Sequence, residues 1–168
     1  MSLLPRTSLA PDPSKLQANL QELTSTADAL NDLSDRLTKQ VAEIEAAVNK
    51  LNLGITANVE VESWADEKGL QWETWRLAYG KNGGGRWGFF VQHLSGTRNF
   101  PEADSLEQSA FHDLSRDRRL RAVEKIPLLL EALVARSKKV ASELSGKLTY
   151  AQSVAASFSP ASPEMPKK

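Results

Sequence analysis

The sequence contains no cysteine among its 168 residues. Disulfide bonds, thiolate metal sites and cysteine nucleophiles are therefore excluded. A run of the ~18–20 apolar residues that a membrane span needs is also missing, because Pro127 and Glu131 interrupt the densest apolar stretch. The first residues, MSLLPRTSLAPDP, lack the apolar core of a secretory signal. We therefore expect a cytoplasmic protein that does not associate with membranes.

The sequence also lacks a complete catalytic motif. Residues 83–88 match the pattern G-x-G-x-x-G of dinucleotide-binding proteins, but that motif holds a pyrophosphate only where a helix follows the glycines. Here a strand, and not a helix, is expected to follow the glycines, so we interpret them as a hairpin turn. His93 and His112 have no metal-ligand spacing, and no G-x-S-x-G elbow is present. The sequence therefore predicts no catalytic residue, no metal site and no cofactor, and an enzyme with an unmarked site is kept only as an alternative.

The net charge is zero, but the charges are unevenly distributed. Residues 114–168 hold 11 basic and 5 acidic side chains, whereas residues 56–113 hold 5 basic and 9 acidic ones. The densest basic run lies at the start of the last predicted helix and holds Arg116, Arg118, Arg121 and Lys125. On a helix, Arg118, Arg121 and Lys125 form one stripe. All four residues are candidates for contacting phosphates of a nucleic acid. We favour the simpler interpretation that they pair with acidic residues of the same assembly.

Apolar residues in the first third follow the spacing of a coiled-coil seam. The steps alternate between four and three residues along Leu16, Leu20, Leu23, Ala27, Leu30, Ser34, Leu37, Val41, Ile44, Val48 and Leu51. Asp12 is a suitable helix cap, Pro13 suits the first helical position, and Gly54 suits the end. The pattern predicts one long helix over residues 12–53.

The same spacing returns near the carboxyl end. Ser115 is the expected cap of a helix over residues 115–158. Pro127 lies inside this pattern, and a proline there removes a hydrogen bond and clashes with the preceding turn. We therefore expect a kink near Pro127, or a break that leaves residues 115–125 as a separate short helix.

The centre of the chain changes to the two-residue period of β-strands over residues 57–94. Three strands separated by two glycine-containing turns predict an antiparallel meander. Its apolar face comprises Val59, Val61, Trp75, Leu77, Tyr79, Trp87, Phe89 and Val91. Residues 95–114 are expected to be a loop, which hides either a helical turn near 103–110 or an edge strand near 110–114.

These elements predict an α+β protein of one domain over residues 12–158. A hairpin of two long antiparallel, coiled-coil-like helices holds a three-stranded antiparallel sheet between them. Residues 1–11 are expected to be a flexible arm and residues 159–168 a disordered tail. Apolar residues beside the two seams favour a homo-oligomer, most simply a dimer with a four-helix core.

The sequence favours a non-enzymatic assembly or adaptor protein with helices that oligomerise. A second surface is expected on the open face of the sheet, where aromatic and cationic residues of the kind found in interaction hot spots would bind a protein partner: Trp72, Arg76, Arg86 and Phe90. The identity of that partner is not encoded in any motif. A nucleic-acid-binding module that uses the basic run is the less favoured alternative.

Overall fold

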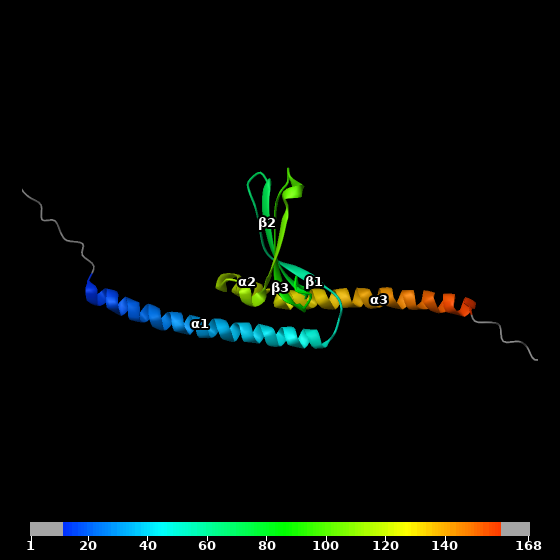
Figure 1. Cartoon of the computed structure of the whole chain (residues 1–168), viewed down its shortest axis with the longest axis horizontal. Helices are drawn as coiled ribbons and strands as arrows, with labels where there is room; N and C mark the ends of the chain where they lie inside the picture. The colour runs from blue at the N-terminus through cyan, green and yellow to red at the C-terminus, as the bar shows by residue number, and fades with distance from the viewer. Residues whose placement is uncertain (1–11, 159–168) are drawn as a thin grey trace, which may run out of the picture. The chain divides into compact units, whose positions relative to one another are not determined.

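The computed structural model describes residues 12–158, so the predicted arm at 1–11 and the predicted tail at 159–168 lie outside the described residues. The chain divides between Ile44 and Glu45 into two compact units, each described here by itself. Its elements follow in the order α1 (Pro13–Lys50), β1 (Ala57–Ala65), β2 (Gln71–Lys81), β3 (Trp87–Thr97), η1 (Pro101–Ala103), β4 (Ser105–Ala110), η2 (Phe111–Asp113), α2 (Arg116–Glu124) and α3 (Ile126–Phe158). Figure 1 shows these elements along the chain. The α+β class with an antiparallel sheet is confirmed.

The predicted number of strands is wrong, since the sheet has four strands in the order β1-β2-β3-β4. Residues 12–158 hold three α-helices in place of two long ones, because the last predicted helix is broken. The extra strand, β4, lies inside the segment 95–114, for which the sequence predicts a loop that hides a helical turn or an edge strand. An edge strand is present, but it lies at Ser105–Ala110 and not near 110–114, and short helical turns lie on both sides of it, at Pro101–Ala103 and Phe111–Asp113. Its sequence SLEQSA has no regular apolar alternation, because its first four residues are exposed at the sheet edge. Strand β4 therefore lacks the two-residue apolar period by which a half-buried strand is recognised in a sequence.

Helix α1 begins as its sequence predicts. The Asp12 carboxylate accepts hydrogen bonds from the backbone N–H and the hydroxyl of Ser14, at 2.9 and 2.6 Å. These bonds favour the ionised carboxyl group and lower the pKa of Asp12. The helix ends at Lys50, and Asn52 and Gly54 then adopt positive φ angles of 46° and 63°. The long helix is thus bounded by a cap and a left-handed stop.

The last helical segment is broken before Pro127, which was one of the two expected outcomes. The Ser115 hydroxyl oxygen caps α2 by accepting a hydrogen bond from the N–H of Arg118. Helix α2 ends at Glu124, and α3 starts at Ile126. Pro127 therefore lies in the first turn of α3, where a missing N–H leaves no helical hydrogen bond unmade.

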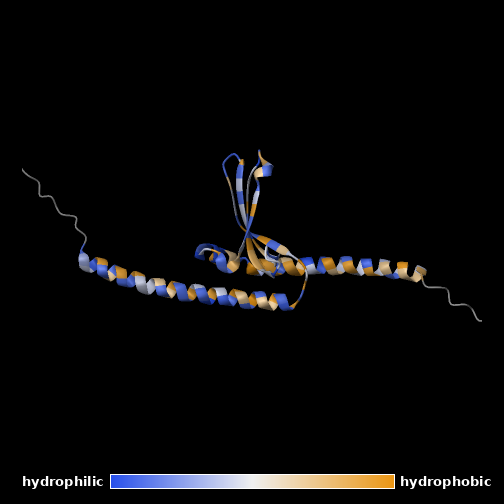
Figure 2. Cartoon of the chain, viewed as in Figure 1, coloured by the Kyte–Doolittle hydropathy of each residue, from blue (hydrophilic) through white to orange (hydrophobic). Residues whose placement is uncertain are grey.

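The core lies where one half of the sheet meets the helices. Helix α3 lies against β1 and β2, and the side chains of Leu77 and Leu129 are completely buried. Around them are further buried apolar residues from the sheet, η2, α2 and α3: Ala78, Tyr79, Phe89, Phe90, Val91, Phe111, Leu114, Ala122, Ile126 and Leu133. Hydrophobic colouring is concentrated in this region (Figure 2).

The other half of the sheet extends beyond the helices that cover its base (Figure 1). It comprises residues 62–75 and 93–108, and none of these residues is buried. The strand register runs from Lys81 opposite Trp87 at the covered end to Gln71 opposite Thr97 at the tip. We call residues 62–75 and 93–108 the projecting end of the sheet. Within residues 12–158, no helix is long and apolar enough to cross a membrane.

The last turns of α1 are fastened to the covered half of the sheet by three hydrogen bonds. The Glu45 carboxylate accepts from the N–H of Phe89 at 2.6 Å, and the Asn49 amide donates to the carbonyl of Trp87 at 3.3 Å. The hydroxyl of Tyr79 donates to Asn49 at 2.7 Å. A Cβ atom at Gly88 would lie 2.9 Å from the Glu45 carboxylate. Gly88 is therefore explained by the approach of Glu45.

We predict that the protein loses stability at alkaline pH partly through Tyr79. Burial, and secondly the charge of Glu45, raise the pKa of Tyr79 above 10.0. The unfolded chain therefore loses the phenolic proton at lower pH than the folded chain. The stabilising contribution is complete below pH 10 and declines as the pH rises through the raised pKa. Urea unfolding at a series of alkaline pH values should show a weaker decline for Tyr79→Phe than for the wild type.

At neutral pH the same Tyr79→Phe variant should lose about 1 kcal/mol of unfolding free energy, because Asn49 loses its hydrogen-bond donor. The exposed Tyr150 provides the matched control, and Tyr150→Phe should leave both the neutral stability and the alkaline decline unchanged. Equal alkaline declines for the wild type and Tyr79→Phe would contradict the assignment.

Candidate partner-binding surface

A β-bulge in β1 determines which side chains reach the helices. The register shifts between Glu60 and Glu62, so that Glu60 lies opposite Arg76 and Glu62 lies opposite Trp75. A bulge places two successive residues against one residue of the neighbouring strand. Glu62 therefore lies on the same face as Trp75, whereas strict alternation along the strand had placed it on the opposite face.

Helix α2 is attached to the sheet at this bulge. The guanidinium of Arg118 lies 3.1 Å from the ring centroid of Trp75, and its Nη1 lies 3.3 Å from Oε1 of Glu62. Arg121 donates to the other carboxylate oxygen of Glu62 and also pairs with Asp117, at 3.1 Å. One carboxylate thus holds two arginines, and one of these arginines makes a cation–π contact.

The stack continues across the sheet to β3. The rings of Trp75 and His93 are 3.9 Å apart at an interplanar angle of 14°. Nε2 of His93 lies 3.5 Å from Glu73, and its Nδ1 lies 3.9 Å from Glu107. Cross-strand pairing explains this arrangement, because His93 lies opposite both Trp75 and Glu107. No group of three or more histidine or acidic side chains in residues 12–158 is arranged to hold a metal ion.

The four sequence-predicted partner-binding residues do not form one surface. Phe90 is buried, with 5% of its surface exposed, so its ring is not available to a partner. Trp72 lies at the tip of the sheet opposite Gly96, whereas Arg86 lies in the hairpin turn at the other end of β2. About nine residues of extended strand separate these ends, or roughly 30 Å. Arg76 lies between them, opposite Glu60 and Gln92.

Trp72 covers Gly96, which lies directly opposite it on β3. A Cβ atom at Gly96 would lie 2.8 Å from the Trp72 ring and nearer still to the Asp104 carboxylate. The indole is therefore partly covered by the chain itself. Trp64, for which the sequence predicts no role, is more accessible, with 55% of its surface exposed.

The candidate phosphate-contacting residues are largely engaged within the chain. Arg118 and Arg121 pair with Glu62, as the simpler interpretation of the basic run expected. Lys125 lies between α2 and α3 as the cap that ends α2. Arg116 is the first residue of α2. The two arginines that point at the sheet thus stabilise the fold.

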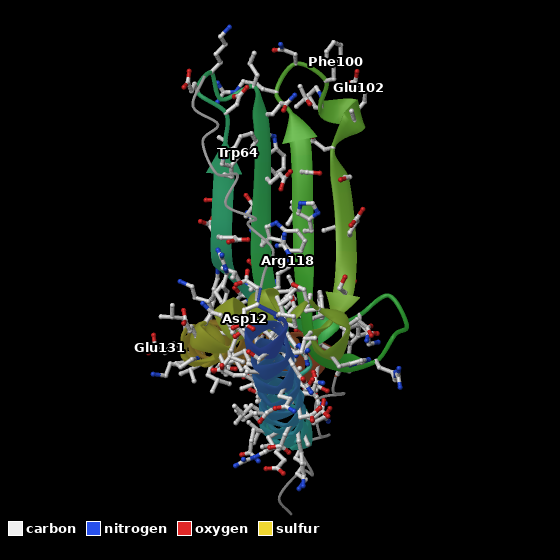
Figure 3. All side chains as sticks on the ribbon, turned by 90° about the vertical axis from the view of Figure 1, so that its left-hand side faces the viewer. Asp12, Trp64, Phe100, Glu102, Arg118 and Glu131 are labelled. Carbon is white, nitrogen blue, oxygen red and sulfur yellow. The ribbon has the colours of Figure 1, made fainter. Side chains whose placement is uncertain are left out.

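Open hollows surround Trp64 on the projecting end. One of about 320 Å³ is lined by Glu62, Ser63, Trp64, Glu73, Trp75 and Arg118. A second of about 350 Å³ lies between Trp64 and Trp72. Figure 3 shows Trp64 farther out on the sheet than Arg118. The local sequence pattern does not predict the position of Trp64, because the bulge in β1 moves the Trp64 side chain to the other face of the sheet.

No match was found among protein-family models, curated proteins or solved structures. The function is therefore inferred from the geometry of the chain alone.

We predict that Glu62→Gln destabilises the folded chain by about 1 kcal/mol, because two arginines lose their shared counter-charge in a partly exposed setting. Urea unfolding followed by tryptophan fluorescence measures the loss. Glu60→Gln is the matched control, since Glu60 lies next to the bulge in an exposed position. Its effect should stay within about 0.5 kcal/mol. Equal effects of the two substitutions would contradict the role assigned to Glu62.

Proposed function

We propose that the protein is a non-enzymatic assembly protein: its helices associate with those of a second copy, and the projecting end of its sheet binds a protein partner. The observation that carries this proposal is the exposed apolar spacing of α3. Every residue from 141 to 158 is exposed, including Leu144 at 63%, Leu148 at 61% and Phe158 at 82%. At the usual rise per residue these 18 residues extend about 27 Å.

A helical segment of this kind needs a partner. An isolated helix is marginally stable in water, and most helical stability in proteins comes from packing of an apolar face. Leu144, Leu148, Ala151, Val154 and Phe158 recur at three- and four-residue steps, which suits packing against a second helix. Helix α1 has the same property, because Leu16, Leu20 and Leu23 are exposed.

The charges of α3 favour a second copy as the partner. Glu143 and Lys147 are the only charged residues between Val140 and Phe158, and their charges cancel. Two identical segments would therefore approach each other without repulsion between net charges. A symmetric pair buries the same apolar residues on both sides, which is the usual arrangement of a homodimer.

Sedimentation and light scattering test this proposal. The wild-type protein should be a dimer or a larger assembly, and its melting temperature should rise with protein concentration. The double substitution Leu144→Glu, Leu148→Glu should shift it toward the monomer, because it places carboxylates in the proposed seam. Both positions are exposed, so the chain itself should remain folded.

The matched control adds the same charges to the other side of the helix. Ser142 and Ser153 are exposed and lie about half a turn away from Leu144 and Leu148. Ser142→Glu, Ser153→Glu should keep the wild-type mass. A monomeric wild-type protein at high micromolar concentration would disprove the proposed assembly.

A further inference from the structure

The contact of Arg118 shows how this face of the sheet holds a cationic side chain. Its guanidinium lies on the indole of Trp75 and pairs with the carboxylate of Glu62, which is the cross-strand neighbour of Trp75. The indole provides an electron-rich face, and the carboxylate provides the opposite charge. Both groups come from adjacent strands at one register position.

The same pair of groups recurs at the next register position on the same face. Trp64 of β1 lies directly opposite Glu73 of β2, two residues beyond Glu62 and Trp75 respectively. Trp64 is 55% exposed, and the Glu73 side chain is 50% exposed. Within residues 12–158, no aromatic ring or cationic group lies on the Trp64 indole. Both residues line the hollow of about 320 Å³, of which Arg118 forms another part of the wall.

The charge of the projecting end favours a cationic ligand. Its residues include seven acidic side chains, Glu62, Asp66, Glu67, Glu73, Glu102, Asp104 and Glu107, but only two basic ones, Lys68 and Arg98. Such a surface attracts basic segments of other proteins and repels nucleic acids. The acidic excess is a property of the whole projecting end, and two of its carboxylates, those of Glu62 and Glu73, line the hollow.

We propose that Trp64 and Glu73 bind an arginine or lysine side chain from a basic segment of a partner protein. The cation lies on the Trp64 indole and pairs with the Glu73 carboxylate. It thus makes the same two contacts that Arg118 makes with Trp75 and Glu62. This inference builds on the proposed function by naming the chemistry of the partner. It also moves the partner-binding site from Trp72, Arg76, Arg86 and Phe90 to the neighbouring Trp64.

The chain of residues 1–168 can be titrated with the peptide acetyl-Gly-Arg-Gly-Arg-Gly-amide while the tryptophan indole N–H signals are followed by NMR. The signal missing from the Trp64→Leu spectrum identifies Trp64. That signal should move on titration, and binding should weaken with added salt. Trp64→Leu and Glu73→Gln should each weaken binding roughly five- to thirty-fold, given the usual strength of a cation–π or charge-assisted contact. The acidic peptide acetyl-Gly-Glu-Gly-Glu-Gly-amide should not bind.

Phe100→Leu is the matched control, because Phe100 is an exposed aromatic residue outside the hollow, in the turn after β3. It should bind the arginine peptide as the wild type does. An unmoved Trp64 signal, equal binding of the acidic peptide, or wild-type affinity of Trp64→Leu would each overturn the proposal.

Light scattering on the same samples separates this proposal from the proposed assembly. A monomeric protein that binds the peptide through Trp64 would disprove the assembly and leave the cation site standing. An assembly that dissociates in Trp64→Leu, with no peptide binding by the wild type, would show that a second copy occupies the hollow and would overturn the cation site.

Discussion

The contact between Arg118, Trp75 and Glu62 is the constraint on which the arrangement of residues 45–158 depends. It fixes the start of α2 against the middle of the sheet. Because only Lys125 separates α2 from α3, the direction of α3 across the sheet follows from this attachment. On one side of the contact, Leu77 and Val91 are buried in the core; on the other side, no sheet residue of the projecting end is buried. A single attachment thus divides one sheet into a structural half and an exposed half.

Local sequence patterns predicted the elements that depend on local causes. The cap at Asp12, the positive-φ stop at Gly54, the cap at Ser115 and the break before Pro127 all follow from the conformational preferences of single residues. The three alternating strands were predicted in the same way. The position of strand β4 was not predicted, because an exposed edge strand such as Ser105–Ala110 needs no apolar alternation to be stable once β3 supplies its hydrogen bonds.

The candidate site was harder to predict, because it depends on features without a local signal. The alternation of VEVES gives no sign of the bulge, and one extra residue moves Glu62 and Trp64 to the other face. Alternation also indicates which face a residue occupies but not which part of that face is covered. Phe90 is therefore buried although its face appeared open. In the same way, Gly88 is explained by Glu45, which lies 43 residues earlier in the chain.

The two exposed surfaces of residues 45–158 differ in chemistry, and this difference allows them to work independently. The exposed part of α3 carries a stripe of apolar side chains and no net charge, so it favours association through burial of apolar surface. The projecting end of the sheet is acidic and holds its one exposed indole beside a carboxylate, so it favours selection of a partner by charge. The sheet and α3 leave the core in different directions (Figure 1). A basic partner on the sheet would therefore leave the apolar face of α3 free to pair, and association of copies would bring several such sheets into one assembly, where even weak individual contacts gain from multivalency.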